Sequence, residues 1–121
     1  MVIEKEKAKG AYLGTETDEK WWKRYRKNKL FMRGSGEYWY DDNGLYFRRF
    51  LTRSPLFFAF DLMREVRLGT WHAGKWCMGH PIIKIIWEMD GLRLSSGFIF
   101  TNSMVDAELI KDGIERKINA K

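Results

Sequence analysis

The sequence has little of what covalent cross-linking or membrane spanning requires. Cys77 is the only cysteine among 121 residues, which excludes an internal disulfide and a zinc site made of cysteines alone. The longest stretch without Asp, Glu, Lys or Arg runs from Leu94 to Val105, far short of the about 20 apolar residues that cross a bilayer. The first residues, MVIEKEKAK, lack the apolar run of a signal peptide. We therefore expect a cytoplasmic protein without a transmembrane segment.

The motifs of common enzyme classes are also missing. The sequence contains no G-x-S-x-G, no P-loop, no H-E-x-x-H and no G-x-G-x-x-G between a strand and a helix. Gly34-Ser35-Gly36 lies within a strand pattern, so no helix follows it to offer free N–H groups to a nucleotide. We predict a protein that is not an enzyme, with no catalytic residue and no cofactor.

Positive charge and aromatic residues are abundant, and they occupy the same part of the chain. Residues 20–53 contain ten Lys or Arg against three acidic residues, a net charge of +7 where the whole chain carries +6. Thirteen aromatic residues lie between Trp21 and Phe60. This combination favours an anionic partner. A composition of 45% apolar and 31% charged residues is that of one folded domain.

The N-terminal part is expected to hold a tether and one helix. Residues 1–15 alternate in charge and contain two glycines, which indicates a flexible segment before a single domain over 16–121. Acidic residues after Thr17 and the run KWWKRYRK predict a short basic helix that ends near Asn28, because acids favour a helix start and bases its end.

The rest of the chain reads as strands and one final helix. Residues 30–53 predict a hairpin that turns at Asp41–Gly44, with positive φ angles at Asn43-Gly44 and a bulge or bend at Gly34 and Gly36. Further elements follow in this order: a strand at Leu56–Phe60, a strand at Met63–Leu68, a loop with a partial strand near Trp71 at Gly69–Pro81, and a hairpin of Ile82–Met89 and Leu92–Phe100. A helix with an apolar stripe and a Ser103 cap runs to about Ile118.

These elements predict an α+β, mainly β domain. About seven antiparallel strands would form a strongly bent sheet or partly open barrel, with a C-terminal capping helix and the short N-terminal basic helix.

The stretch from Pro55 to Val66, the strand end Ser96–Phe100 and the Ser103-capped helix resemble the GRAM and pleckstrin-homology-like family over roughly Lys29 to Ile118. The resemblance implies a module that binds acidic lipids, or peptides and proteins at a sheet edge, and it places basic residues around the first β-turn. The turn that we assign to that place, Asp41–Gly44, is acidic and would repel a phosphorylated headgroup. Arg48 and Arg49 are adjacent, so they should point to opposite faces of their strand.

Two groups of residues are the candidate binding site, and each has a structural alternative. Five basic residues would bind an anionic surface, unless they form only a solvated helix face: Lys23, Arg24, Arg26, Lys27 and Lys29. Trp71, Lys75 and Trp76 would anchor a partner from the loop, unless the tryptophans close the barrel as core residues. His72, Cys77 and His80 fit no standard metal spacing, so we predict no metal there.

The sequence therefore favours a non-catalytic binding or adaptor module that recognises an acidic membrane surface or a protein or peptide partner, with peripheral attachment to the membrane in the first case. The alternative is a nucleic-acid-binding protein that uses the basic and aromatic residues of Lys20–Arg53. A homo-oligomer is compatible with both.

Overall fold

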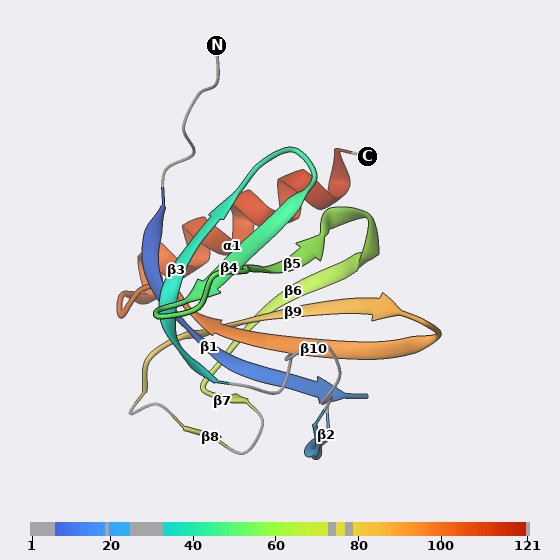
Figure 1. Ribbon diagram of the computed structural model, residues 1–121, viewed down its shortest axis with the longest axis horizontal. Helices are drawn as coiled ribbons and strands as arrows, with labels where there is room; N and C mark the ends of the chain where they lie inside the picture. Colours follow the sequence, from blue (N-terminus) through green and yellow to red (C-terminus); the bar gives the residue numbers. More distant parts are fainter. Residues whose placement is uncertain (1–6, 19, 25–32, 73–74, 77–78, 121) are drawn as a thin grey trace.

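The computed structural model describes residues 7–18, 20–24, 33–72, 75–76 and 79–120. Its strands are β1 (Ala8–Thr17), β2 (Lys20–Arg24), β3 (Gly34–Tyr40), β4 (Gly44–Arg49), β5 (Leu56–Ala59), β6 (Met63–Gly69), β7 (Trp71–His72), β8 (Lys75–Trp76), β9 (Ile82–Met89) and β10 (Leu92–Ile99) (Figure 1). A 3₁₀ helix at Phe60–Leu62 joins β5 to β6, and the helix α1 (Met104–Asn119) follows β10.

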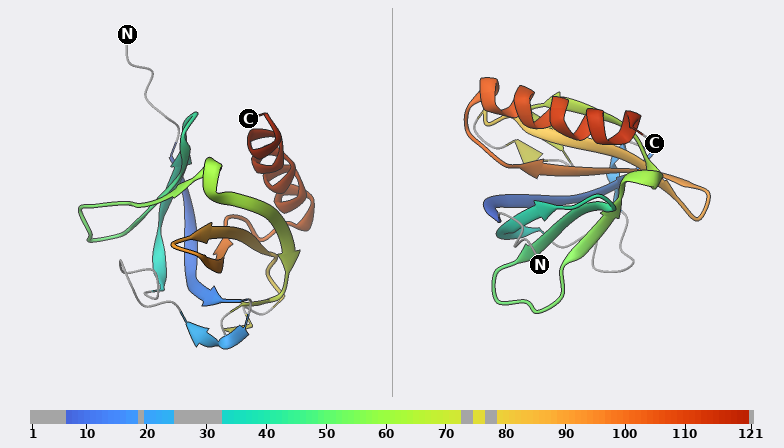
Figure 2. Two further views of the ribbon diagram at one scale, coloured as in Figure 1. Left: turned by 90° about the vertical axis from the view of Figure 1, so that its right-hand side faces the viewer. Right: turned by 90° about the horizontal axis from the view of Figure 1, so that it is seen from above.

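Seven strands form an open antiparallel sheet in the order β5-β4-β3-β1-β10-β9-β6, and β2 pairs with the end of β1. β1 joins the two halves of the sheet, because its residues 8–12 pair with β3 and its residues 11–17 pair with β10. The register with β10 shifts between Tyr12 and Thr15, where Gly14 adopts a φ of 94°. Such a bulge bends a strand, and Figure 2 shows the sheet curling around its interior.

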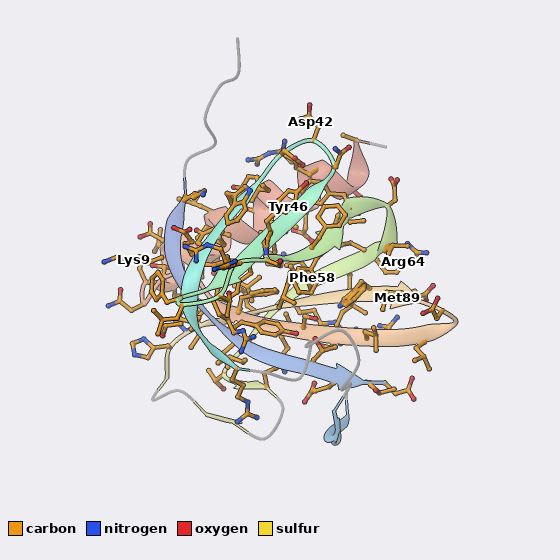
Figure 3. The ribbon with its side chains drawn as sticks, viewed as in Figure 1. Lys9, Asp42, Tyr46, Phe58, Arg64 and Met89 are labelled. Carbon is orange, nitrogen blue, oxygen red and sulfur yellow. The ribbon has the colours of Figure 1, made fainter. Side chains whose placement is uncertain are left out.

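Aromatic side chains fill the bend of the sheet. Tyr12, Phe47, Phe58 and Phe98 are fully buried, and the Tyr12 and Phe98 ring centroids lie 5.2 Å apart. Phe58 meets Phe98 edge to face at 5.3 Å and lies within the curled sheet in Figure 3. Contacts of this geometry stabilise a core beyond the area they bury.

Helix α1 lies against β6 and covers the open side of the sheet (Figure 2). Ile114 is 1% exposed, and Ile110 and Ile118 pack on the same core. Ser103 caps the helix, because its Oγ accepts a hydrogen bond from the Asp106 N–H at 3.3 Å. The predicted mainly β fold, with a strongly bent sheet of seven strands and a C-terminal helix, is confirmed.

The prediction of a short N-terminal basic helix is wrong for the part of that segment that the structure describes. Residues Lys20–Arg24 form strand β2, which folds back on β1 with Glu16 opposite Arg24. Asp18 makes the turn between them with a φ of 55°, and its N–H donates to the Arg93 carbonyl at 2.9 Å. Pairing with a strand that is already in the sheet therefore overrides the charge pattern of a helix. Residues 25–28 lie outside the described residues.

The flexible segment expected over 1–15 is wrong for residues 8–15, which belong to the central strand β1. Two glycines suggested a breaker, but neither ends the strand. Gly10 lies under the Phe100 ring, where a Cβ would come within 2.9 Å of Phe100 Cδ1, and Gly14 forms the bulge. Tyr12 and Leu13 between them are buried.

The predicted hairpin at Asp41–Gly44 is confirmed, but the reasons for its glycines differ from those expected. Among the described residues with a positive φ, neither Asn43 nor Gly44 occurs. A Cβ on Gly44 would lie 2.4 Å from the Phe58 carbonyl oxygen, and one on Gly36 would lie 2.1 Å from that of Arg48. The register of β3 with β1 and β4 is continuous, so the expected bulge is absent from this described strand. Close approach of neighbouring strands explains both glycines.

Candidate functional site

Strand β2 carries the first two of the predicted basic residues. Lys23 and Arg24 lie on β2, whose backbone pairs with the end of β1. The other three, Arg26, Lys27 and Lys29, lie outside the described residues. The segment 18–33 that contains all five connects β1 to β3, so it is the first connection along the main sheet.

The predicted partial strand near Trp71 is confirmed as part of a small hairpin. β7 and β8 pair antiparallel, which sets Trp71 opposite Trp76 and His72 opposite Lys75. This hairpin and β2 both lie at the lower end of the molecule in Figure 1. The fold thus brings β2, with Lys23 and Arg24, and the β7–β8 hairpin to one end of the domain, although they are far apart in the sequence.

Glu16 links strands β2 and β7 at this end of the domain. Its backbone is the register partner of Arg24 on β2, and its carboxylate Oε1 lies 3.5 Å from His72 Nδ1 on β7. Both side chains are buried, with exposures of 4% for Glu16 and 1% for His72. Removing either side chain would leave a polar group without its neighbour in the interior, which is costly.

His72 is a buried structural histidine in this arrangement. Its Nε2 lies 2.8 Å from the Gly14 carbonyl oxygen, and its ring packs on Gly97. His80 is half-buried, and Cys77 lies outside the described residues. Within the part of the chain that is described, no three His, Cys, Asp or Glu residues are grouped as metal ligands.

The acidic turn is remote from this end. The Asp41–Gly44 turn joins β3 to β4, and Figure 3 shows Asp42 at the opposite end of the molecule from β2. The expectation that it is the first turn of the sheet is therefore wrong, because β1 and the segment 18–33 precede it. At physiological ionic strength the screening length is about 8 Å, so the charge of this turn has little effect on an anion at the β2 end.

The acidic turn has a structural role of its own. The Asp41 carboxylate accepts hydrogen bonds from the Asn43 N–H at 2.8 Å and from the Tyr46 hydroxyl at 3.0 Å. Desolvation, together with this hydrogen bond and the Asp41 charge, raises the pKa of Tyr46. Tyr46 therefore stays protonated and holds the turn, while its ring stacks on that of Trp39 and is tilted against that of Phe57.

Sequence reasoning missed the loop between β4 and β5. In this loop Phe50 is 46% exposed and Leu51 is 103% exposed, with a φ of 68°. That left-handed conformation costs a leucine about 1–2 kcal/mol. The exposure and the φ angle of these residues depend on the three-dimensional fold. The sequence RFLTRSP shows only that two apolar residues, Phe50 and Leu51, are adjacent.

Arginines flank the two exposed apolar residues of this loop. Arg49 and Arg53 line a cavity of about 390 Å³ beside the loop, together with Thr52 and Ser54. Arg48 does not line it, because its guanidinium is 2.6 Å from the Glu37 carboxylate on the other face of β4. The opposite orientation expected for Arg48 and Arg49 agrees with this placement.

Comparison with known proteins gave a match to a family model. The model of one protein family, described as bacterial PH domain-like, matches residues 3–113. That range runs from before β1 into α1 and so includes every strand of the bent sheet. A search of curated proteins found no match. Within the described residues, no helix is both long and apolar enough to cross a membrane.

Proposed function

Because the chain belongs to the bacterial PH domain-like family, we propose that it is a non-catalytic binding module that attaches to an acidic membrane surface on the cytoplasmic side. The residues that would make the contact are those of the basic segment between β1 and β3, with Trp71, Lys75 and Trp76 of the β7–β8 hairpin beside it. Two further expectations stay predictions: that the chain is closely related to GRAM domains, and that it associates with copies of itself.

The observation that carries the proposal is the local concentration of charge. Residues 20–33 contain seven Lys or Arg and no Asp or Glu. The acids nearest in sequence stand before this run or belong to β3 and its turn, and Glu16 is buried against His72. Clustered positive charge without interspersed acid attracts an anionic surface, and each basic residue near such a surface contributes about 1 kcal/mol.

Reversal of three of these charges tests the proposal. The variant Lys23→Glu/Arg24→Glu/Lys27→Glu should bind vesicles that contain phosphatidylserine at least about a hundredfold more weakly than wild type, since it loses three favourable charges and gains three repulsive ones. Co-sedimentation at low salt measures this. Asp42→Lys is the control, because the Asp42 side chain is 99% exposed in the turn at the opposite end of the domain, and it should bind at least as well as wild type.

Other outcomes would favour other partners. If the triple variant binds vesicles as well as wild type does, the basic segment is a solvated surface and the proposal is wrong. If wild type ignores vesicles but binds single-stranded DNA or RNA with a steep salt dependence, the nucleic-acid alternative replaces it. Binding of a peptide or protein with neither response would point to an adaptor that uses a sheet edge.

A further inference from the structure

The β4–β5 loop, residues 50–55, displays one apolar side chain, that of Leu51, which the fold leaves fully exposed. Leu51 is 103% exposed at a φ of 68°, and Phe50 beside it is 46% exposed. A leucine in the left-handed region is strained, and glycine or asparagine would be favoured there. Folding therefore gains nothing from this side chain at this position. Figure 2 shows the loop, coloured green, projecting from the body of the molecule.

The loop is nevertheless held in a defined shape. The Phe50 N–H donates to the Ser35 carbonyl at 3.0 Å, and the Thr52 N–H and Oγ1 both donate to the Arg49 carbonyl, at 3.1 and 2.6 Å. Arg48 Nη1 donates to the Thr52 carbonyl at 2.8 Å. These bonds fix the chain on both sides of Leu51. The apolar tip is thus preorganised, which lowers the entropic cost of inserting it into a partner.

Positive charge surrounds the apolar tip. The sequence from Asn43 to Phe60 contains no Asp or Glu. Arg49 and Arg53 line the cavity on one side of the loop, with the hydroxyl-bearing Thr52 and Ser54 between them. Lys9 lines a second cavity, of about 490 Å³, together with Phe50. The nearby Arg48 is neutralised by Glu37, so it adds no net positive charge beside the tip.

We propose that the β4–β5 loop is a membrane-insertion element, in which Leu51 and Phe50 enter the acyl boundary of an anionic bilayer while Arg49 and Arg53 contact lipid phosphates. A protruding apolar tip with a basic collar matches the layering of a bilayer surface, which has an anionic headgroup zone above an apolar interior. This inference rests on the proposed function for its partner, but on different residues.

The same membrane can meet the loop and the basic segment together. In the left view of Figure 2, the loop forms the left edge of the molecule and β2 the lower edge, so a flat surface at the lower left would touch both. Two weak contacts on one surface act as one stronger attachment, because the second is made at high effective concentration.

The test substitutes Leu51→Asn and measures binding to phosphatidylcholine vesicles with and without phosphatidylserine. Asparagine tolerates the left-handed conformation, so the variant should melt at the wild-type temperature or above it. Its binding to the anionic vesicles should fall about tenfold, as expected for the loss of one inserted leucine. Leu109→Asn is the matched control, because Leu109 is 63% exposed on α1, and it should bind like wild type. Leu51→Trp should bind more tightly than wild type.

The outcomes separate this inference from the proposed function. Loss of binding in Leu51→Asn but not in Leu109→Asn supports insertion. If Leu51→Asn binds like wild type while the Lys23/Arg24/Lys27 reversal abolishes binding, insertion is wrong and the basic segment alone holds the membrane. If the reversal has no effect while Leu51→Asn loses binding, the proposed basic site is wrong and the loop is the attachment. If wild type binds neither kind of vesicle, both are overturned.

Discussion

Gly97 on β10 shows how one small residue can fix a buried arrangement. The His72 imidazole packs directly on it, between Gly14 and Glu16 of β1. An added Cβ at Gly97 would lie 2.4 Å from His72 Cδ2, far inside contact distance. The ring cannot retreat without giving up its neighbours on β1, so this position excludes a larger residue.

We therefore predict that Gly97→Ala lowers the free energy of unfolding by about 1–3 kcal/mol, the usual effect of overpacking a core. Urea denaturation measures it. Gly97→Ala combined with His72→Ala should restore part of the loss, because the second change removes the ring that clashes. A single variant as stable as wild type would show that the ring moves freely and is not held between β1 and β10.

At the scale of single residues, the sequence indicates which glycines are under a structural constraint, but it does not reveal what that constraint is. The sequence predicts a bulge at Gly36 and a positive φ at Gly44, but both glycines lie under the backbone of a neighbouring strand. His72 was weighed as a metal ligand and is buried beside Glu16. In each case the deciding contact comes from a residue distant in sequence or on another strand, which no local pattern encodes.

Helix α1 is the element that local signals describe best. Its apolar stripe lies within the helix and its Ser103 cap directly before it, and the structure has both. Strand β2 is the opposite case, because its partner is the end of β1 and its own sequence is compatible with a helix. Elements defined by their own periodicity could be predicted, whereas those defined by a partner could not.

We predict that Ile114→Asp destabilises the domain by about 3–5 kcal/mol, because it places an unpaired charge at a position that is 1% exposed. Leu109→Asp on the exposed side of the same helix should change stability by less than about 0.5 kcal/mol. Thermal melting of the two variants compares them. Equal melting temperatures would show that α1 does not dock on the sheet through Ile114.

A third substitution on α1 should stabilise the protein. Gly113 lies inside the helix, and a Cβ there would meet only Arg116 Nη2, at 3.9 Å. Gly113→Ala should therefore raise the free energy of unfolding by about 0.5–1 kcal/mol, since alanine loses less backbone entropy in a helix. A lower melting temperature for this variant would show that the space above Gly113 is needed by the folded chain.

For the molecule as a whole, the bent sheet determines which charges act together. Asp41 and Asp42 stand at one end, and β2 and the β7–β8 hairpin stand at the other (Figure 1). The sequence shows that basic and aromatic residues share one region, but it predicts a tether over residues 1–15 and therefore places the acidic turn at the first connection, which the segment between β1 and β3 occupies. The β4–β5 loop escaped notice altogether, since its significance lies in exposure and φ.

Attachment through charge and apolar insertion together predicts a characteristic salt response. Raising the ionic strength shortens the screening length from about 30 Å at 0.01 M to about 3 Å at 1 M, so the contribution of the basic segment should vanish. The contribution of Leu51 and Phe50 should remain. Wild type should therefore keep a weak affinity for anionic vesicles at high salt, and Leu51→Asn should lose it. Complete release of wild type at high salt would leave no role for insertion.

The most direct test of the account is the partition of the wild-type protein between phosphatidylcholine vesicles and the same vesicles containing phosphatidylserine, measured by co-sedimentation at low salt. Strong binding to the anionic vesicles and at least tenfold weaker binding to the neutral ones are expected, because only the anionic surface would attract the positive charge of residues 20–33. Equal binding to both kinds of vesicle, or binding to neither, would contradict it.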